Sequence, residues 1–488
     1  MPETVTKKRF ALNAVWKILE QFSAKGISMI VSIVLARILS PNDYGLLALT
    51  AVFTNLSDIL IDGGFGTALV RKETVDEYDY GAVFSVSSSV SILLYAIVFF
   101  AAPYVAQYYS SPALTTVLRV IGLTFFIQAF SAVRNGIVNR NMQFKLLFFC
   151  NTTASIISGV FGIVAAYSGL GVWALVIQRL SQQTILTILL FIKVKWKIKW
   201  KFDLKRIKEM LSFSIGVVGS SLLNYVGGNI YNVAIGKKYS VTDLGYYDKG
   251  GQLPMQFSLY TFGAMSSVLL PTISSCQSDL ERVKKIIRKV VGMTSFLIIP
   301  LMTGMALVSR EMIVLLFSEK WLPSVPIMQC SCLYYLATPY MLINVQVFFA
   351  LGRSHLRVKT EIIRLALMAA SLALFGFVLN CSMNELAFVC AVIAVLVSFI
   401  TYVEVRKLIQ YQVAELFGDL WKPALASIIM GVLLILFQKT VSIESAIISL
   451  LAKGILGVSI YAATAYIMKM PELKDFMDLI RRRRKTNE

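Results

Sequence analysis

The chain has 488 residues, of which 57% are hydrophobic and only 15% are charged, and its formal net charge is +20. A soluble protein contains about 25% charged residues, so this composition excludes an ordinary water-soluble fold and favours a membrane protein. The excess of Lys and Arg does not indicate nucleic-acid binding, because the cations lie in short loops between apolar segments rather than on one basic domain.

Histidine and cysteine give no support to metal or redox chemistry. His355 is the single histidine, and the six cysteines show neither the spacing of a metal site nor a disulfide framework. We therefore expect no metal, no bound cofactor and no catalytic histidine.

Fourteen segments are long and apolar enough to cross a membrane, which takes about 20 mostly apolar residues in a helix. They cover residues 10–39, 44–65, 81–105, 113–136, 146–168, 171–192, 211–235, 245–270, 291–316, 324–350, 359–380, 385–405, 418–437 and 445–468. The first, second, seventh and eighth segments carry polar residues and glycines inside apolar runs. The sequence predicts an all-α polytopic membrane protein with about fourteen transmembrane helices.

The loops between these segments differ in charge. Loops on the side of the N-terminus hold 34 Lys and Arg residues, whereas loops on the opposite side hold 4. Because the cytoplasmic loops of membrane proteins are rich in Lys and Arg, this bias predicts cytoplasmic N- and C-termini in a bacterial inner membrane. The first segment is predicted to be an uncleaved helix, since no short apolar core with a cleavage site follows the N-terminal cations.

Three basic segments on the cytoplasmic side are predicted to anchor the chain at the membrane surface. Residues 193–201 alternate Lys with apolar residues that include Trp196, and residues 279–291 place apolar residues at helical spacing. The third segment is the basic tail around 481–485. Trp at the headgroup level and Lys beside it suit anionic membrane lipids as binding partners.

A short motif recurs 200 residues along the chain. Asp43-Tyr44-Gly45 opens the second segment after a polar turn, and Asp243-Leu244-Gly245 opens the eighth. Aspartate suits a helix N-cap, and glycine permits close helix packing. The offset covers six spans, so both copies have one orientation, which predicts two six-helix lobes related by a parallel pseudo-two-fold axis around a central cavity. The lobes are residues 1–200 and 201–410, and 411–488 adds two helices and the tail.

Five passages in a fixed order carry a family resemblance: 35–49, 58–71, 244–254, 268–274 and 350–354. Through them the chain resembles the polysaccharide-export branch of the multidrug/oligosaccharidyl-lipid/polysaccharide (MOP) exporter superfamily, which includes Wzx O-antigen flippases and WzxC- and TuaB-like lipopolysaccharide and polysaccharide biosynthesis proteins. The resemblance implies two lobes around a cationic cavity. It also implies export of undecaprenyl-pyrophosphate-linked oligosaccharides (O-antigen, capsule or exopolysaccharide repeat units) from the inner to the outer leaflet by alternating access.

Four of the cations in the predicted spans lie near helix ends. Arg37, Lys249 and Arg310 are near outer ends, and Arg364 is near an inner end. A long side chain at such a position can extend to the headgroups, so snorkelling and a cavity-lining role both remain open for these four.

Three further cations, Lys25, Arg119 and Arg179, lie deeper in the spans of the first lobe. A charge at this depth is costly unless it faces a cavity or a partner. We expect the three to line the cavity and bind the pyrophosphate of the substrate, because a guanidinium group matches phosphate oxygens. The alternative is an internal salt bridge with Asp58 or Asp62.

Asp58 and Asp62 are one helical turn apart and share one face of the second helix. Two nearby carboxylates can bind Na⁺ or share a proton, so cation coupling is one interpretation of the pair. The other is that Asp62, which precedes Gly63 and Gly64, caps a turn.

The sequence leaves two functions of one fold open. One is a lipid-linked oligosaccharide flippase, and the other is a cation-coupled exporter of small molecules such as drugs. Basic residues in the first-lobe spans favour an anionic cargo. An enzyme is not expected, because the chain has no large outer loop, no DxD motif in a cytoplasmic domain and no G-x-x-x-x-G-K-[ST] motif. A polysaccharide polymerase and other export components are expected partners.

Overall fold

The computed structural model describes residues 7–63, 69, 72, 74–196, 204–441, 443 and 445–475, and over these ranges it contains helices and no strand. The chain divides into two compact units, unit 1 from Met1 to Gly245 and unit 2 from Tyr246 to Glu488. The predicted lobe boundaries at 200 and 410 stay predictions. Gly64, the basic tail and residues 197–201 of the basic segment lie outside the described residues.

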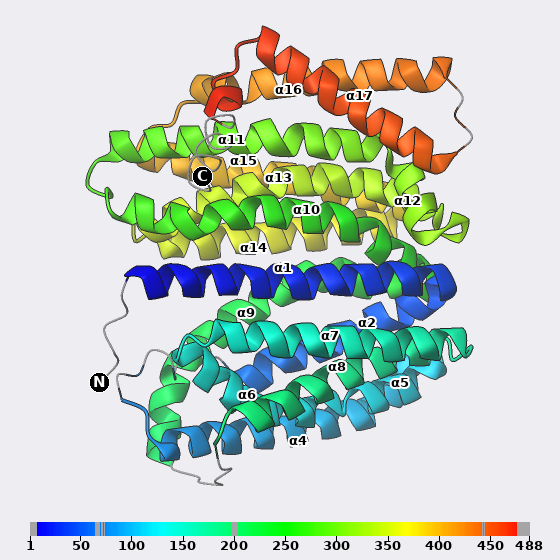
Figure 1. The fold of residues 1–488 in the computed structure, drawn as a ribbon, viewed down its shortest axis with the longest axis vertical. Helices are drawn as coiled ribbons and strands as arrows, with labels where there is room; N and C mark the ends of the chain where they lie inside the picture. The colour runs from blue at the N-terminus through cyan, green and yellow to red at the C-terminus, as the bar shows by residue number, and fades with distance from the viewer. Residues whose placement is uncertain are drawn as a thin grey trace. The chain divides into compact units, whose positions relative to one another are not determined.

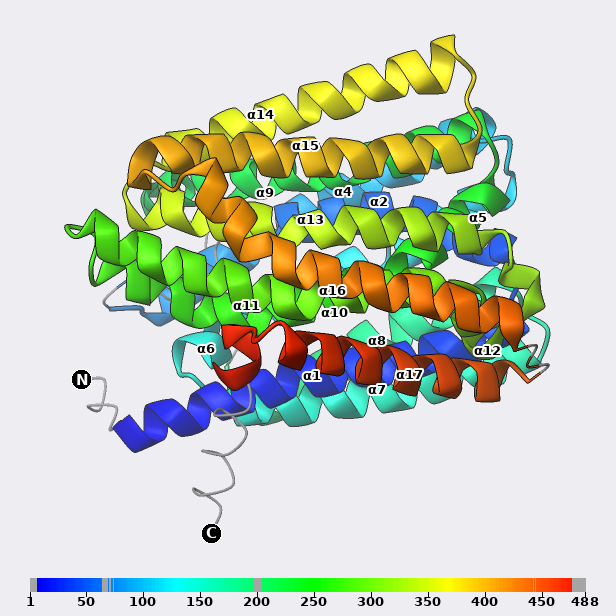
Figure 2. The ribbon, with the colours of Figure 1, turned by 90° about the horizontal axis from the view of Figure 1, so that it is seen from above.

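The helices of unit 1 are α1 (Lys7–Ile38), α2 (Pro41–Asp62), α4 (Glu77–Tyr108), α5 (Ala113–Ile121), α6 (Thr124–Arg140), α7 (Phe144–Tyr167), α8 (Val172–Lys193), α9 (Leu204–Lys238) and the first turn of α10 (Val241–Ser274). Those of unit 2 are the rest of α10, α11 (Leu280–Leu307), α12 (Ser309–Phe317), η1 (Glu319–Trp321), α13 (Ser324–Ala350), α14 (Ser354–Ser371), η2 (Leu372–Val378), α15 (Met383–Ile409), α16 (Val413–Thr440) and α17 (Ala446–Ile467). Within unit 1, α7 packs against α1 and α8, and within unit 2, α13 packs against α15 and α16 against α11 (Figures 1 and 2).

The helices agree in position with the predicted segments, each of which overlaps one long helix or two consecutive helices. In the part of the chain that the structure describes, 11 helical stretches have the length and hydropathy of a membrane span. The predicted segments outside this set correspond to α1, α9 and α10, whose apolar runs are interrupted by polar residues and glycines. The all-α polytopic fold is confirmed, and the number fourteen stays a prediction for these three helices.

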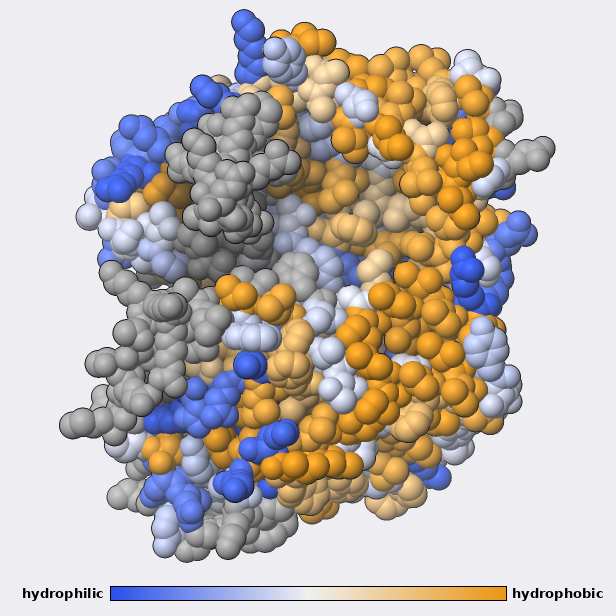
Figure 3. Space-filling model, viewed as in Figure 1, coloured by the Kyte–Doolittle hydropathy of each residue, from blue (hydrophilic) through white to orange (hydrophobic). Residues whose placement is uncertain are grey.

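Large apolar side chains are exposed along the sides of the helices. On α7, Val160 and Val164 are 51% and 58% exposed, and on α17, Ile455 and Val458 are 68% and 72% exposed. Figure 3 shows hydrophobic residues over much of the visible face, with hydrophilic residues gathered towards the helix ends. Soluble monomers rarely expose apolar surface on this scale, so the chain is a multi-pass membrane protein.

The repeated motif forms the same local structure twice. At the start of α2, the Asp43 N–H donates to the Ser40 hydroxyl at 3.3 Å, and the Ser40 N–H donates to the Asp43 carboxylate at 2.9 Å. At the start of α10, the Asp243 N–H donates to the Ser240 hydroxyl at 3.0 Å. The prediction that aspartate is the N-cap was wrong for α2, because Ser40 is the N-cap and Asp43 completes a capping box from the third helical position.

Gly45 and Gly245, which occupy equivalent places in the two motifs, meet within unit 1. A Cβ atom on Gly45 would lie 1.7 Å from the carbonyl oxygen of Val241, and one on Gly245 would lie 2.0 Å from that of Pro41. Each glycine thus faces the carbonyl four residues before the other glycine, so the contact is nearly symmetric. The backbones of α2 and of the first turn of α10 touch directly, a contact that only glycine permits.

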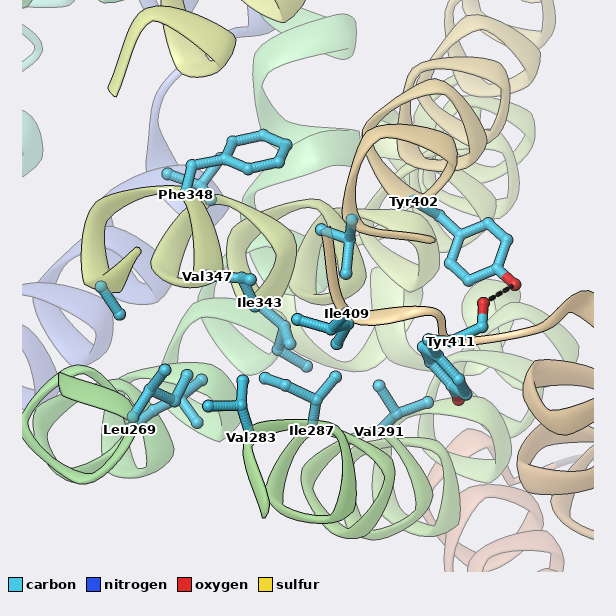
Figure 4. Packing of buried hydrophobic residues seen from close by; sticks show 14 of the residues in the cluster. Leu269, Val283, Ile287, Val291, Ile343, Val347, Phe348, Tyr402, Ile409 and Tyr411 are labelled. Carbon is cyan, nitrogen blue, oxygen red and sulfur yellow. Dashed lines mark hydrogen bonds between the residues drawn. The ribbon is translucent and has the colours of Figure 1, made fainter. Parts of the chain in front are cut away.

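The amphipathic segment 279–291 is the beginning of α11 and not a surface helix. Its apolar residues Val283 and Ile287 are fully buried in a cluster that includes Ile343 and Tyr411, as Figure 4 shows. The predicted membrane anchor was therefore wrong for this segment. Helical spacing reveals that one face is apolar, but protein rather than lipid covers that face here.

The described start of segment 193–201 also packs against protein. The Trp196 ring lies 5.9 Å from the Phe84 ring and 6.4 Å from the Tyr80 ring, measured between centroids. Arg134 donates a hydrogen bond to the Trp196 carbonyl at 3.2 Å. Trp196 is thus held by α4 and α6 rather than placed freely among headgroups.

We expect Gly45→Ala to destabilise the protein and Gly454→Ala to leave it stable. A methyl group on Gly45 collides with a backbone carbonyl, so a helix start must shift at a cost of about 1–3 kcal/mol. Gly454 in α17 has open space at its Cβ position, and alanine favours a helix there by about 1 kcal/mol. Thermal unfolding of the purified protein in detergent measures both. Equal unfolding midpoints for the two variants would contradict the backbone contact.

Candidate functional site

An ion pair lies among the helices of unit 1. Arg179 Nη2 on α8 is 3.3 Å from Asp58 Oδ2 on α2, and both helices have the hydropathy of membrane spans. The side chains of Arg179 and Asp58 are 43% and 29% exposed. Charges exposed to hydrocarbon are strongly unfavourable, so we expect the exposed part of this pair to face water rather than lipid. The pair is therefore a candidate site for a charged ligand.

Uncharged polar side chains from three helices, α6, α8 and α9, lie close to this pair. Gln128 on α6 lies within hydrogen-bonding reach of Asp58, and Gln183 on α8 donates to Ser131 on α6 at 3.4 Å. On α9, the Tyr225 hydroxyl donates to the Ala51 carbonyl of α2 at 2.9 Å. Such groups can exchange hydrogen bonds with a polar ligand at little cost, since hydroxyls and amides both donate and accept. We call the set Asp58, Gln128, Ser131, Arg179, Gln183 and Tyr225 the Asp58 cluster.

The uncharged members of the Asp58 cluster were not predicted from the sequence. A usable signal was present, because Gln128 and Ser131 are three residues apart and Arg179 and Gln183 are four apart, so each pair shares a helix face. Amide and hydroxyl side chains in spans are common enough in helix packing that this signal alone does not identify a site.

The three predicted cavity cations have different surroundings. Arg179 joins Asp58, which is the salt bridge that the sequence analysis named as the alternative. Arg119 lies against α4, where its Nε donates to the Phe99 carbonyl at 3.2 Å and its guanidinium lies 4.1 Å from the Phe99 ring centroid. Lys25 is exposed on α1. A shared role for Lys25, Arg119 and Arg179 in substrate binding stays a prediction.

Asp62 is the last residue of α2 and is exposed, one turn beyond Asp58. Gly63 follows in the left-handed conformation with φ 55° and donates its N–H to the Ile59 carbonyl at 3.0 Å, so Gly63 itself closes the helix end. Over the described ranges, no group of three or more His, Cys, Asp and Glu side chains is placed to hold a metal ion. A role for Asp58 and Asp62 in cation coupling stays a prediction.

Unit 2 contains a buried charged group on α14. Glu361 pairs with Arg364 and lies 3.2 Å from Arg357, and Glu361 and Arg364 are only 6% and 9% exposed. Tyr334 of α13 is within hydrogen-bonding reach of Arg364. Arg364 therefore does not extend to the headgroups. Of the two interpretations left open by the sequence, snorkelling is excluded for this residue.

Lys249 likewise points into unit 2. It is 2% exposed, its Nζ donates to Gln252 Oε1 at 2.9 Å, and it lies 5.5 Å from the ring centroid of Phe317. Arg37 and Arg310 are exposed, as snorkelling side chains would be. All four cations lie near the ends of the predicted helices, yet two are buried and two are exposed. The position of a cation along its helix therefore does not predict whether its side chain is buried.

Comparison with known proteins links this chain to polysaccharide biosynthesis. The family described as "Polysaccharide biosynthesis protein" matches residues 34–326, more than half of the chain. "Teichuronic acid biosynthesis protein TuaB" of Bacillus subtilis (strain 168) is 24% identical over 382 residues, which cover 78% of this chain and 79% of the relative. "Succinoglycan biosynthesis transport protein ExoT" of Rhizobium meliloti (strain 1021) is 23% identical over 67% of this chain and 66% of the relative.

Among solved structures, the lipid II flippase MurJ in an inward closed conformation is similar in fold. Its TM-score is 0.73 at 17% sequence identity, and the match covers 96% of this chain and 100% of that one. At this identity the similarity establishes the fold.

We expect Asp58 and Arg179 to stabilise each other by less than about 1 kcal/mol, because solvent screens a partly exposed pair. A double-mutant cycle with Asp58→Asn and Arg179→Gln, followed by unfolding in detergent, measures this coupling. Arg119→Gln is the matched control and should combine additively with Asp58→Asn, since Phe99 rather than Asp58 holds Arg119. Coupling of Asp58 to Arg119 and none to Arg179 would contradict the observed pairing.

Proposed function

Because the chain belongs to the polysaccharide biosynthesis protein family, we propose that it is a flippase that moves an undecaprenyl-pyrophosphate-linked oligosaccharide from the inner to the outer leaflet. The oligosaccharide is the repeat unit of an O antigen, a capsule or an exopolysaccharide. The observation that carries the proposal is the family match, and the names of the relatives, which refer to teichuronic acid and to succinoglycan transport, support a glycan cargo. The predicted membership in the polysaccharide-export branch of the MOP superfamily is confirmed.

The proposed location is the bacterial inner membrane, with both termini in the cytoplasm. The 34 to 4 distribution of Lys and Arg between the two sides supports this orientation. The cargo then enters from the cytoplasmic side and leaves on the opposite side by alternating access. This role is transport without a catalytic step.

The Asp58 cluster supplies the chemistry that an anionic cargo needs. A guanidinium group has five N–H donors, and the contact of Arg179 with Asp58 is a single distance of 3.3 Å between partly exposed groups. A diphosphate, with its higher charge and more acceptor oxygens, can take the place of Asp58 on Arg179. Asp58 then serves as the partner of Arg179 whenever the cargo is absent.

The second candidate function is a cation-coupled exporter of small molecules with the same fold. Asp62 favours it, because this carboxylate is exposed one turn from Asp58 and has no ion pair among the described residues. The same pair can also serve a flippase that uses an ion gradient, so a coupling role for Asp58 and Asp62 is compatible with either cargo.

We expect Arg119→Gln and Arg179→Gln together to abolish most flipping, because the diphosphate then loses its cationic partners. The assay is complementation of a deletion strain, which should lack its surface polysaccharide and accumulate the lipid-linked repeat unit. The wild-type gene should restore the polysaccharide, and the double variant should restore less than about a tenth of it, equivalent to about 1.4 kcal/mol or more.

Arg310→Gln is the matched control for this experiment, since Arg310 is exposed and lies outside unit 1. It should complement fully at equal membrane abundance. Normal surface polysaccharide in the deletion strain, with increased sensitivity to cationic drugs, would instead support the small-molecule exporter. Full complementation by the double variant would exclude the proposed role of Arg119 and Arg179.

We expect Asp62→Asn to remove the dependence of transport on an ion gradient. Asparagine keeps the size of the side chain but neither titrates nor attracts a cation strongly. The measurement is flipping in vesicles with an imposed proton or sodium gradient. The wild type should respond to one gradient and the variant to neither, with Glu77→Gln in α4 as a control for loss of a carboxylate. A wild type that ignores both gradients would rule out coupling through this pair.

A further inference from the structure

A cavity of about 620 Å³ opens at one end of unit 1, where α6 ends, α7 begins and α8 ends. Its polar lining comes from Asn141, Gln143, Lys145 and Lys193. The volume lies in the range of pockets that hold small ligands. We call this space the α6–α7 pocket.

The charge of the α6–α7 pocket is positive. Lys145 and Lys193 are both exposed, and no carboxylate is among its lining residues. The nearby Arg140 is engaged elsewhere, because its guanidinium donates to the backbone carbonyls of Leu69 and Lys72. The two lysines therefore determine which ligands suit the pocket, and an anion with several oxygens fits their charge.

One wall of the pocket is apolar and continues onto the lipid-facing side of α7. Met142, Leu146 and Phe149 form this wall, and Phe149 is 52% exposed. Further along α7, Ile156 and Val160 are 50% and 51% exposed. A ligand with an anionic head and apolar chains can thus place the head between the lysines and the chains along α7.

Aromatic rings hold Lys145 at this place. Its Nζ lies 5.5 Å from the centroid of the Trp16 ring, and Trp16 packs against Phe148 and Phe149 at centroid distances of 5.4 and 6.1 Å. Tryptophan beside lysine is typical of the membrane–water interface. The pocket therefore lies at headgroup depth.

We propose that the α6–α7 pocket binds the headgroup of an anionic glycerophospholipid from the cytoplasmic leaflet. The choice of the cytoplasmic leaflet depends on the proposed function, in which the loops rich in Lys and Arg are cytoplasmic. The pocket lies on that side because α8 continues from Lys193 into the basic segment 193–201. A bulk phospholipid suits this place better than the glycan carrier does, because the apolar wall continues into exposed apolar residues of α7 and the pocket is built from other residues than the Asp58 cluster. Two ammonium groups on flexible stems suit an exchangeable lipid, whereas a guanidinium would fix one geometry.

The test is thermal unfolding of the full-length protein in a maltoside detergent with added short-chain lipids. Short-chain phosphatidylglycerol should raise the unfolding midpoint of the wild type in a saturable way, and phosphatidylcholine with the same chains should not. Lys145→Gln combined with Lys193→Gln should weaken the apparent affinity for phosphatidylglycerol at least about tenfold, because ligand-linked stabilisation follows affinity. Lys145→Arg with Lys193→Arg should retain it, which separates a lost charge from a folding defect.

Lys285→Gln with Lys474→Gln is the matched control, since both residues are exposed and the charge change is the same. This control should respond to phosphatidylglycerol as the wild type does. An equal loss in the control and the pocket variant would show a nonspecific charge effect and overturn the proposal. Lysine-dependent stabilisation by farnesyl diphosphate, without any by phosphatidylglycerol, would overturn it in favour of a carrier-loading site. The readout contains no transport step, so failure of the proposed flippase function would leave this result unaffected.

Discussion

The direct backbone contact between Gly45 and Gly245 fixes where α2 and α9 lie in unit 1. It joins the starts of α2 and α10, and α9 leads into α10 through a short turn. Further along α2, Tyr225 of α9 donates to the Ala51 and Val52 carbonyls at 2.9 and 3.1 Å. Asp58 follows within two turns. The glycine contact at one end of α2 thus helps to place α9, one of the helices near the carboxylate at the other end.

A charge in an apolar helix is costly unless it has a partner, which explains the ion pairs of buried charges in unit 2. Lys453 of α17 is 5% exposed and pairs with Glu311 of α12, and Glu361 lies between two arginines. Removing one partner from such a buried pair costs about 3–5 kcal/mol. The Lys453–Glu311 pair thus holds α17 against α12, whereas the ion pairs of Glu361 lie within α14. Asp58 and Arg179 differ because both are partly exposed. Their pairing is correspondingly weaker, as exchange with a ligand requires.

The sequence predicts the helices well because spanning segments need only length and apolar composition. It also predicts that the repeated motif begins a helix in both places, although the N-cap of α2 is Ser40 and not Asp43. Partners across helices are a different matter. No sequence pattern links Arg119 to Phe99. The apolar spacing of Val283 and Ile287 is the same whether lipid or protein covers that face of the helix. These contacts depend on helix rotation and packing, which one-dimensional periodicity does not determine.

The choice of cation agrees with the surroundings of each site. Arg179 lies among helices, where a guanidinium keeps its charge and matches carboxylate or phosphate oxygens. Lys145 and Lys193 lie at an exposed pocket, where strongly hydrated ammonium groups exchange partners readily. Release of an anion from Arg179 would cost free energy, because it would leave a guanidinium group that is only partly solvated. For the proposed diphosphate cargo, Asp58 at 3.3 Å would reduce this cost, since Arg179 would regain a partner as the diphosphate leaves. In the proposed flippase, a carboxylate beside the binding cation would therefore favour turnover over tight retention of the cargo.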